Sequence, residues 1–157
     1  MQPIDRLQTL AEQGDADAQC ALGDLFAYHE GANLNPGRAM YWYRKAAEQG
    51  HANAQWLLGA GYFNGVGANQ DLEQAQYWLR KSAEQGCADG QYGLGGYYFF
   101  KHDYAISEEW LKKAAEQGHA DAQQILPDIS LLANIGIITK DKTHAPTQYN
   151  VWERDLF

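Results

Sequence analysis

Histidine, cysteine and carboxylate side chains are the groups of this sequence that could bind metals or act in catalysis. A metal site or a nucleophile–base pair needs such groups at close or periodic spacing. The histidines show no metal-ligand spacing, and no Ser/His/Asp order stands out; a paired-carboxylate site stays open only because any acidic surface offers candidates. We therefore predict no enzyme, no metal and no cofactor for a chain whose histidines are His29, His51, His102, His119 and His144.

A glycine-containing turn and two cysteines are the other candidates for chemistry. The letters "GVG" at residues 65–67 lack the GK[ST] ending of a phosphate-binding loop, and helical patterns flank them on both sides. Cys20 and Cys87 lie two repeat units apart, whereas a disulfide needs Cα atoms within about 7 Å. We expect two buried or partly buried free thiols, which fit a reducing cytoplasm.

The charge of the chain bears on its partners. Twelve Lys and Arg stand against twenty Asp and Glu, and the formal net charge is −8. A surface that binds the phosphate backbone of nucleic acid needs positive charge, so nucleic acid is not expected as a partner. No apolar run approaches the roughly 20 residues that span a bilayer, so no membrane contact is expected either. The start "MQPIDRLQTL" has no signal-peptide pattern. We expect a cytoplasmic protein, with the periplasm as the alternative if a leader has been removed.

A nine-residue phrase occurs four times and reveals internal repeats. Near-copies of "AEQGHADAQ" begin at Ala11, Ala47, Ala83 and Ala115. A period of about 36 residues with helical patterning inside it is typical of a solenoid, here with a first and a second helix in each unit. "AEQ" should end a second helix, the glycine should be left-handed, and Ala-x-Ala-Gln should begin the next first helix. The glycines are Gly14, Gly50, Gly86 and Gly118, and the first-turn polar residues are Asp17, Asn53, Asp89 and Asp121.

The second unit shows the two helices most clearly. Ala54, Leu58 and Tyr62 recur every four residues and mark one face of a first helix. A second helical pattern follows the turn "NGVGANQD", and Asp71 with Gln74 resembles a capping box at its start. In the first unit, Asn35 is the expected cap and Pro36 suits the first helical position. The second helical pattern consists of Leu72, Ala75, Trp78, Leu79 and Ala83.

Two further residue types keep the same register in several units. A glycine inside a helix costs about 1 kcal/mol of propensity, so its recurrence after a leucine predicts a close approach of two helices. We expect Gly59→Leu to overpack that contact by roughly 1–3 kcal/mol. A tryptophan recurs in the second helix, which is more typical of a core than of a ligand site. These residues are Gly23, Gly59 and Gly95, and Trp42, Trp78 and Trp110.

These units resemble the Sel-one-like repeat (SLR) family, a relative of the tetratricopeptide repeats. The resemblance rests on "AxAQxxLGxxY", present as "ANAQWLLGAGY" and "ADGQYGLGGYY", and on endings such as "AQYWLRKSAEQG", and it covers residues 7–126. It implies an all-α, right-handed α-solenoid of stacked helix–turn–helix repeats whose concave surface serves protein contacts without catalysis. Departures are Phe26 at the tyrosine position, a third unit four residues shorter, and Pro127 where other units carry glycine.

An aromatic stripe on the first helices is the candidate binding site. At 100° per residue, Trp56 and Phe63 point away from the core of their own helix pair, and Tyr92 and Phe99 share their register. In the related tetratricopeptide architecture the first helices line the concave side, and aromatic anchors are typical of binding hot spots. The alternative is that the four rings pack between neighbouring first helices. Trp56→Ala would then cost about 3–5 kcal/mol of stability.

The C-terminal residues differ from the repeats. Pro127 should stop or kink the fourth first helix, and "DISLLANIG" should form a short capping helix ending at Gly136. Tyr149, Trp152 and Phe157 could anchor the tail on the solenoid, our preferred reading, or in a neighbouring copy, which would be self-association. We assign one helical-repeat domain to residues 1–136 (partial unit 1–14; units of about 15–50, 51–86 and 87–118; truncated unit and cap 119–136) and a tail to 137–157.

The function expected from these patterns is a non-catalytic scaffold that binds another protein or peptide in the concave groove. An immunity or inhibitor protein that neutralises a bacterial toxin or effector is one alternative, because some bacterial members of the family take that role. A sugar- or peptidoglycan-binding protein is another, because aromatic stripes also stack on sugars. The residues that choose a ligand lie at positions the units do not share.

Overall fold

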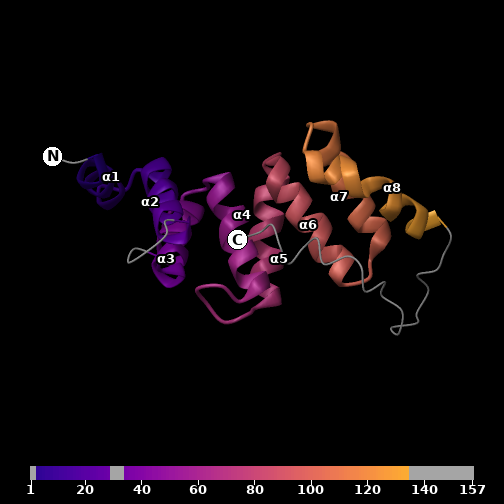
Figure 1. Ribbon diagram of the computed structural model, residues 1–157, viewed down its shortest axis with the longest axis horizontal. Coiled ribbons are helices and arrows are strands. Elements are labelled where there is room, and N and C mark those ends of the chain that lie inside the picture. Colours follow the sequence, from indigo (N-terminus) through magenta and orange to yellow (C-terminus); the bar gives the residue numbers. More distant parts are fainter. Residues whose placement is uncertain (1–2, 29–33, 135–157) are drawn as a thin grey trace.

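The computed structural model describes residues 3–28 and 34–134, and the regular secondary structure of these residues is entirely helical. The helices follow one another along the long axis of the molecule, from α1 at one end to α8 at the other (Figure 1). The predicted all-α, right-handed solenoid is confirmed. The helices are α1 (Pro3–Glu12), α2 (Ala16–Tyr28), α3 (Pro36–Glu48), α4 (Ala52–Asn64), α5 (Leu72–Glu84), α6 (Ala88–Phe100), α7 (Tyr104–Glu116) and α8 (Ala120–Asn134).

The repeated phrase forms the junction between units, as predicted. The second helices α3, α5 and α7 end two residues before a glycine, and α1 ends in the same way. Each glycine is left-handed, a conformation that glycine adopts without the steric cost of a Cβ atom. The next first helix then begins two residues later, so every unit meets its neighbour through the same turn. The φ angles are 98° at Gly14, 93° at Gly50, 85° at Gly86 and 87° at Gly118.

The predicted helix caps are present, with one difference. Asn35 accepts a hydrogen bond from the backbone N–H of Arg38, and Pro36 follows at the first helical position. Asp71 accepts from the backbone N–H groups of Glu73 and Gln74, both at 3.0 Å. The Gln74 side chain accepts a hydrogen bond from the Trp78 indole, so it serves the core rather than a reciprocal capping box.

The recurring glycines of the first helices are the points where each unit closes on itself. A Cβ atom at Gly59 would lie 2.8 Å from Cγ of Leu79 and 3.0 Å from its backbone nitrogen. Gly23 lies equally close to the ring of Tyr43, and Gly95 lies close to Leu111. The close approach predicted from the glycine register is therefore confirmed, and it occurs between the two helices of one unit.

Several hydrophobic clusters form the core along the stack. Trp42 and Trp78 are buried, as predicted, while Trp110 is half-buried beneath the ammonium group of Lys113, which lies 4.0 Å from the ring centroid. The predicted first-helix face of Ala54, Leu58 and Tyr62 is also buried. Each tryptophan therefore contributes to the packing of second helices rather than to an exposed ligand site.

Of the two outcomes predicted for Pro127, a stop or a kink of the last first helix, the stop is wrong, and the kink stays a prediction. Helix α8 continues through Pro127 to Asn134, so "DISLLAN" extends α8 instead of forming a separate cap. Pro127 is exposed, and the buried side chains of Ile125 and Ile129 hold α8 against the core formed with α7. Residues Ile135 and Gly136 and the tail 137–157, with Tyr149, Trp152 and Phe157, lie outside the described residues.

Candidate functional site

The first helices form one side of the solenoid. Helix α4 packs directly on α6, whereas α3 and α5, and α5 and α7, make no comparable contact. The pairs α2 with α4 and α6 with α8 make no comparable contact either. The position of the first helices on a concave side therefore stays a prediction from the related tetratricopeptide architecture. We call the outward face of α2, α4, α6 and α8 the first-helix wall; its side chains include Asp17, Tyr28, Asn53, Asp89, Phe100, Asp121 and Leu131.

Two of the predicted aromatic residues lie at the seam between neighbouring units. Trp56 is half-buried, and a Cβ atom at Gly93 of α6 would lie 3.2 Å from its Cδ1 atom. The indole N–H of Trp56 is buried and has no acceptor among the described residues. Tyr92 is only 5% exposed and stacks on the imidazole of His119, with 4.4 Å between the ring centroids.

The other two predicted residues are also packed against neighbouring rings. Phe63 is half-buried and meets Phe100 of α6 edge to face, with 5.3 Å between the centroids. Phe99 is half-buried and contacts Tyr104 in the same way at 5.2 Å. The burial of all four side chains agrees with the alternative that they pack within the stack. Contact of a ligand with these residues stays a prediction for all four: Trp56, Phe63, Tyr92 and Phe99.

The exposed apolar side chains of the first-helix wall are different residues. Tyr28, Phe100 and Leu131 are between 50% and 57% exposed, and they lie in the last turns of α2, α6 and α8. Leu131 occupies the register of Phe63 and Phe99, while Tyr28 and Phe100 lie one residue beyond it. Tyr28 and Phe100 are therefore offset by about one helix position, or 100°, from the predicted stripe, whereas Leu131 lies in its register.

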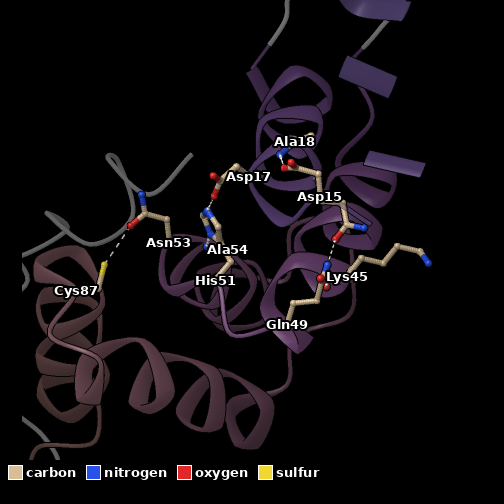
Figure 2. A network of polar contacts seen from close by, with 10 residues as sticks. Asp15, Asp17, Ala18, Lys45, Gln49, His51, Asn53, Ala54 and Cys87 are labelled. Atoms are coloured by element: carbon tan, nitrogen blue, oxygen red, sulfur yellow. Dashed lines mark hydrogen bonds and ion pairs between the residues drawn. The ribbon is translucent and has the colours of Figure 1, made fainter. Parts of the chain in front are cut away.

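The other end of the wall carries polar contacts between units, and Figure 2 shows those of Asp17 with His51 and of Asn53 with Cys87. His51 accepts a hydrogen bond from the backbone N–H of Ala54 through Nδ1, at 3.1 Å. The neutral ring therefore carries its proton on Nε2, which lies 3.2 Å from Oδ1 of Asp17 in the preceding unit. His119 and Asp89 repeat this contact at 3.2 Å two junctions later. These histidines cap first helices and join units, a role that we did not predict.

The junction at Gly86 keeps the contact between units without a histidine. Cys87 occupies the cap position of α6 and makes no side-chain capping bond. Its Sγ atom lies 3.3 Å from Oδ1 of Asn53, the residue in the register of Asp17 and Asp89. An amide at this register is therefore compatible with an intact junction.

A glutamine pair joins the two helices of each complete unit, and its first-helix member also donates a hydrogen bond across the preceding junction. The Nε2 atom of Gln55 donates to the carbonyl of Ala47 at 3.0 Å, and its Oε1 atom accepts from Gln85 at 2.6 Å. Ala47 lies in α3 and Gln85 caps the C-terminal end of α5, so the buried side chain of Gln55 in α4 joins three helices. The signal for this role was the glutamine that recurs on both sides of the junction glycine. The other complete pairs are Gln19 with Gln49 and Gln91 with Gln117.

The two free thiols, and the half-buried carboxyl group of Asp24 whose pKa is raised, have structural roles. Cys20 is buried and unpaired, and Cys87 is half-buried and unpaired, as predicted. Burial raises the pKa of Cys20 to about 12, so its thiol stays neutral and is a poor nucleophile. Burial also raises the pKa of Asp24, whose Oδ1 atom accepts a hydrogen bond from the Tyr43 hydroxyl at 2.8 Å.

Small-molecule and metal sites are not supported by the described residues. A cavity of about 170 Å³ between α2, α3 and the turn after α4 is lined by apolar side chains, and ligand pockets are usually larger and carry polar groups. Within residues 3–28 and 34–134, no three His, Cys, Asp or Glu side chains are grouped to hold a metal ion. No helix in that part of the chain is long and apolar enough to cross a membrane. The cavity is lined by Ala27, Pro36, Ala39, Met40 and Val66.

Comparisons with known proteins place this geometry in context. The sequence model of the Sel1 repeat matches residues 16–51, 52–87 and 88–119. A protective antigen of uropathogenic Escherichia coli that displays an SLR fold is 38% identical, with a TM-score of 0.74 over 85% of this chain and 29% of that chain. A Sel1 repeat protein from Oxalobacter formigenes is 33% identical, with a TM-score of 0.69 over 82% of this chain and 99% of that chain. This chain thus spans about 29% of the length of the antigen. None of the curated proteins that were compared matches the sequence.

Proposed function

Because the chain belongs to the Sel1 repeat family, we propose that its first-helix wall binds a segment of another protein and catalyses no reaction on it. Members of this family commonly mediate protein–protein interactions, and repeat scaffolds of this kind are generally non-catalytic. We place the wall on the concave side of the solenoid by analogy with the related tetratricopeptide architecture, because a concave side gives an extended segment more contact than a convex side would.

The observation that carries this proposal is the exposure of Tyr28, Phe100 and Leu131 in the last turns of three of the four first helices, α2, α6 and α8. Binding is favoured when a partner covers large apolar side chains and removes them from water. Aromatic residues are also frequent hot spots of binding. The half-buried ring of Phe63 extends this surface between α4 and α6, because it contacts Phe100. The apolar contacts would therefore lie along one edge of the wall.

A pair of matched double variants tests the location. Tyr28→Ser with Phe100→Ser alters the first-helix wall, and Tyr41→Ser with Tyr77→Ser alters equally exposed rings on the second helices, at 54% and 49% exposure. Each immobilised protein is incubated with an extract of the source cells, and the retained proteins are quantified after melting curves show that both variants are folded. The wall variant should lose a protein that the wild type and the second-helix variant retain. Loss in the second-helix variant alone would place the binding face on the other side.

The same experiment separates the alternative functions. Retention of a toxin or effector would identify the chain as an immunity protein, which is a specific form of protein binding. Titration of cell-wall fragments should give no heat with the wild type, and heat that the Tyr28→Ser, Phe100→Ser variant abolishes would favour sugar binding instead. No particular contact of the described residues favours either alternative.

A further inference from the structure

Charge is divided between the two layers of the solenoid. The first helices α2, α6 and α8 contain aspartates, α4 has Asn53 in the same register, and none of the four contains Lys or Arg. Within the described residues every Lys and Arg lies on α1, α3, α5 or α7, apart from Lys101 in the turn after α6. The second helices also carry glutamates, so their charges are mixed, whereas those of the first helices have one sign. The first-helix aspartates are Asp17, Asp24, Asp89, Asp121 and Asp128.

The helix dipole does not account for this division. An aspartate in the first turn is stabilised by the dipole, which suffices for Asp17, Asp89 and Asp121. Asp24 and Asp128 lie in the middle of α2 and α8, two turns further along the same face, where the dipole gives no such benefit. Asp24 has a structural role instead, because it accepts a hydrogen bond from Tyr43.

The last turns of the helices give the stronger argument. The dipole favours a cation there, and the second helices carry one at Lys45, Lys81 and Lys113. The four first helices have no basic residue in their last turns. The last turns of α2, α6 and α8 instead expose Tyr28, Phe100 and Leu131. The dipole would favour cations in the last turns of first and second helices alike. Helix stability therefore does not explain why only the second helices carry them.

The negative charge of the wall is accessible. The Asp17 side chain is 93% exposed, and that of Asp89 is 45% exposed. Their partners His51 and His119 cancel the carboxylate charge only when the imidazole is protonated. A segment that crosses the wall would therefore meet carboxylates at the N-terminal ends of the first helices and apolar side chains at the C-terminal ends.

From this division we propose that the occupant of the first-helix wall is a cationic protein segment, in which Lys or Arg residues alternate with apolar side chains. This inference rests on the proposed function, because it names the partner of the same surface. Its Lys or Arg groups would lie against the row of Asp17, Asp89 and Asp121, and its apolar groups against Tyr28, Phe100 and Leu131. Complementary charge would set the direction and register of the bound segment.

Two triple variants with the same net charge provide the test. Asp17→Asn, Asp89→Asn and Asp121→Asn remove three charges from the wall, and the second unit already carries Asn53 in this register with its junction intact. Glu48→Gln, Glu84→Gln and Glu116→Gln remove three exposed charges at the ends of the second helices. The probe is a labelled peptide of about 12 residues made of lysine, leucine and glycine, and its control has glutamate in place of lysine. Binding is followed by fluorescence anisotropy at about 50 mM and about 300 mM salt.

The wild type should bind the lysine peptide, and its affinity should fall about tenfold between the two salt concentrations. The asparagine variant should bind about tenfold more weakly than the wild type, while the glutamine variant should stay within about twofold. Equal losses in both variants would overturn the proposal, because they would indicate general attraction to an acidic protein. Equal binding of the glutamate peptide by the wild type would overturn it without any variant.

The proposed function can fail separately. If the lysine peptide does not bind but a native partner is lost in the Tyr28→Ser, Phe100→Ser variant, the wall binds protein and the cationic occupant is wrong. If the lysine peptide binds the wild type and binds the asparagine variant more weakly, the charge inference holds. It holds even where the Tyr28→Ser, Phe100→Ser variant retains every native protein. In that case the apolar edge proposed as the docking surface would be wrong.

Discussion

The glutamine pairs offer a one-atom test of how the units are joined. Gln55 is 4% exposed, and its Nε2 atom donates to the Ala47 carbonyl at 3.0 Å while its Oε1 atom accepts from Gln85. The substitution Gln55→Glu keeps the shape of the side chain and the acceptor for Gln85. It replaces the donor by an oxygen that faces the Ala47 carbonyl. The junction then loses one hydrogen bond and gains a buried negative charge.

The structure bounds the cost of this change. The lower bound is the lost hydrogen bond, which is about 1 kcal/mol. The upper bound is the free energy of protonating the new carboxyl group at pH 7, because the protonated group can again donate to Ala47. With an ordinary pKa of about 4.3 this is about 3.7 kcal/mol. At about 2–4 °C per kcal/mol, the melting temperature should fall by roughly 2–15 °C.

The pH dependence has a definite sign. The folded state raises the pKa of the new carboxyl group, so it binds more protons than the unfolded state between the two pKa values. The deficit of the variant is therefore complete above the folded-state pKa and shrinks as the pH falls toward 4. Urea unfolding followed by circular dichroism at pH 7 and pH 4 measures both quantities.

Gln123 is the matched control, because it donates to Ala115 at 2.9 Å from an exposed position. There the substitution Gln123→Glu should cost less than about 1 kcal/mol, since the carboxylate can turn into water. Equal losses at Gln55 and Gln123, with no recovery at low pH, would refute the conclusion that the buried glutamines hold the junctions.

Further substitutions test the packing and the buried charge. Gly59→Ala should destabilise the protein by about 1 kcal/mol in urea unfolding, although alanine favours helices, because its Cβ atom would lie 2.8 Å from Leu79; an increase in stability would contradict the close approach. Trp56→Phe should change stability by less than about 1 kcal/mol because it removes an indole N–H that has no acceptor among the described residues, whereas Trp56→Ala should cost about 3 kcal/mol. A neutral Trp56→Ala variant would show that the ring does not pack the seam. Burial raises the pKa of Asp24, so the wild type should lose stability as the pH rises from about 4 to neutrality. Asp24→Asn, which keeps an acceptor for Tyr43, should remove that loss, and unchanged pH profiles would contradict the assignment.

The repeat architecture could be predicted because its determinants are local. A left-handed turn requires glycine at Gly50 and Gly86, and a cap requires a short acceptor such as Asn35 or Asp71. Each of these residues acts within a few positions of its place in the sequence. The glycine register also predicted the contact of Gly59 with the second helix, because a costly residue that recurs needs a packing reason.

The site was harder to predict because its residues act across units. Whether Tyr92 lies at the surface depends on His119, which stacks on it from the next junction. The capping role of His51 depends on both Asp17 and its own ring tautomer, and neither is visible in a helical periodicity. A stripe drawn at 100° per residue also loses accuracy when the exposed side chains, such as Phe100, lie one residue away. Pro127 was misjudged for the same reason, since Ile125 and Ile129 hold α8 in place around it.

The central claim is that the first-helix wall is the docking face and that charge selects its occupant. Backbone amide resonances of the isotope-labelled protein, recorded while the lysine peptide is added, test this most directly. The account predicts shifts confined to α2, α4, α6 and α8, largest near Asp89 and Phe100, and suppressed by about 300 mM salt. Shifts centred on the exposed faces of α3, α5 and α7, or shifts that salt leaves unchanged, would contradict it.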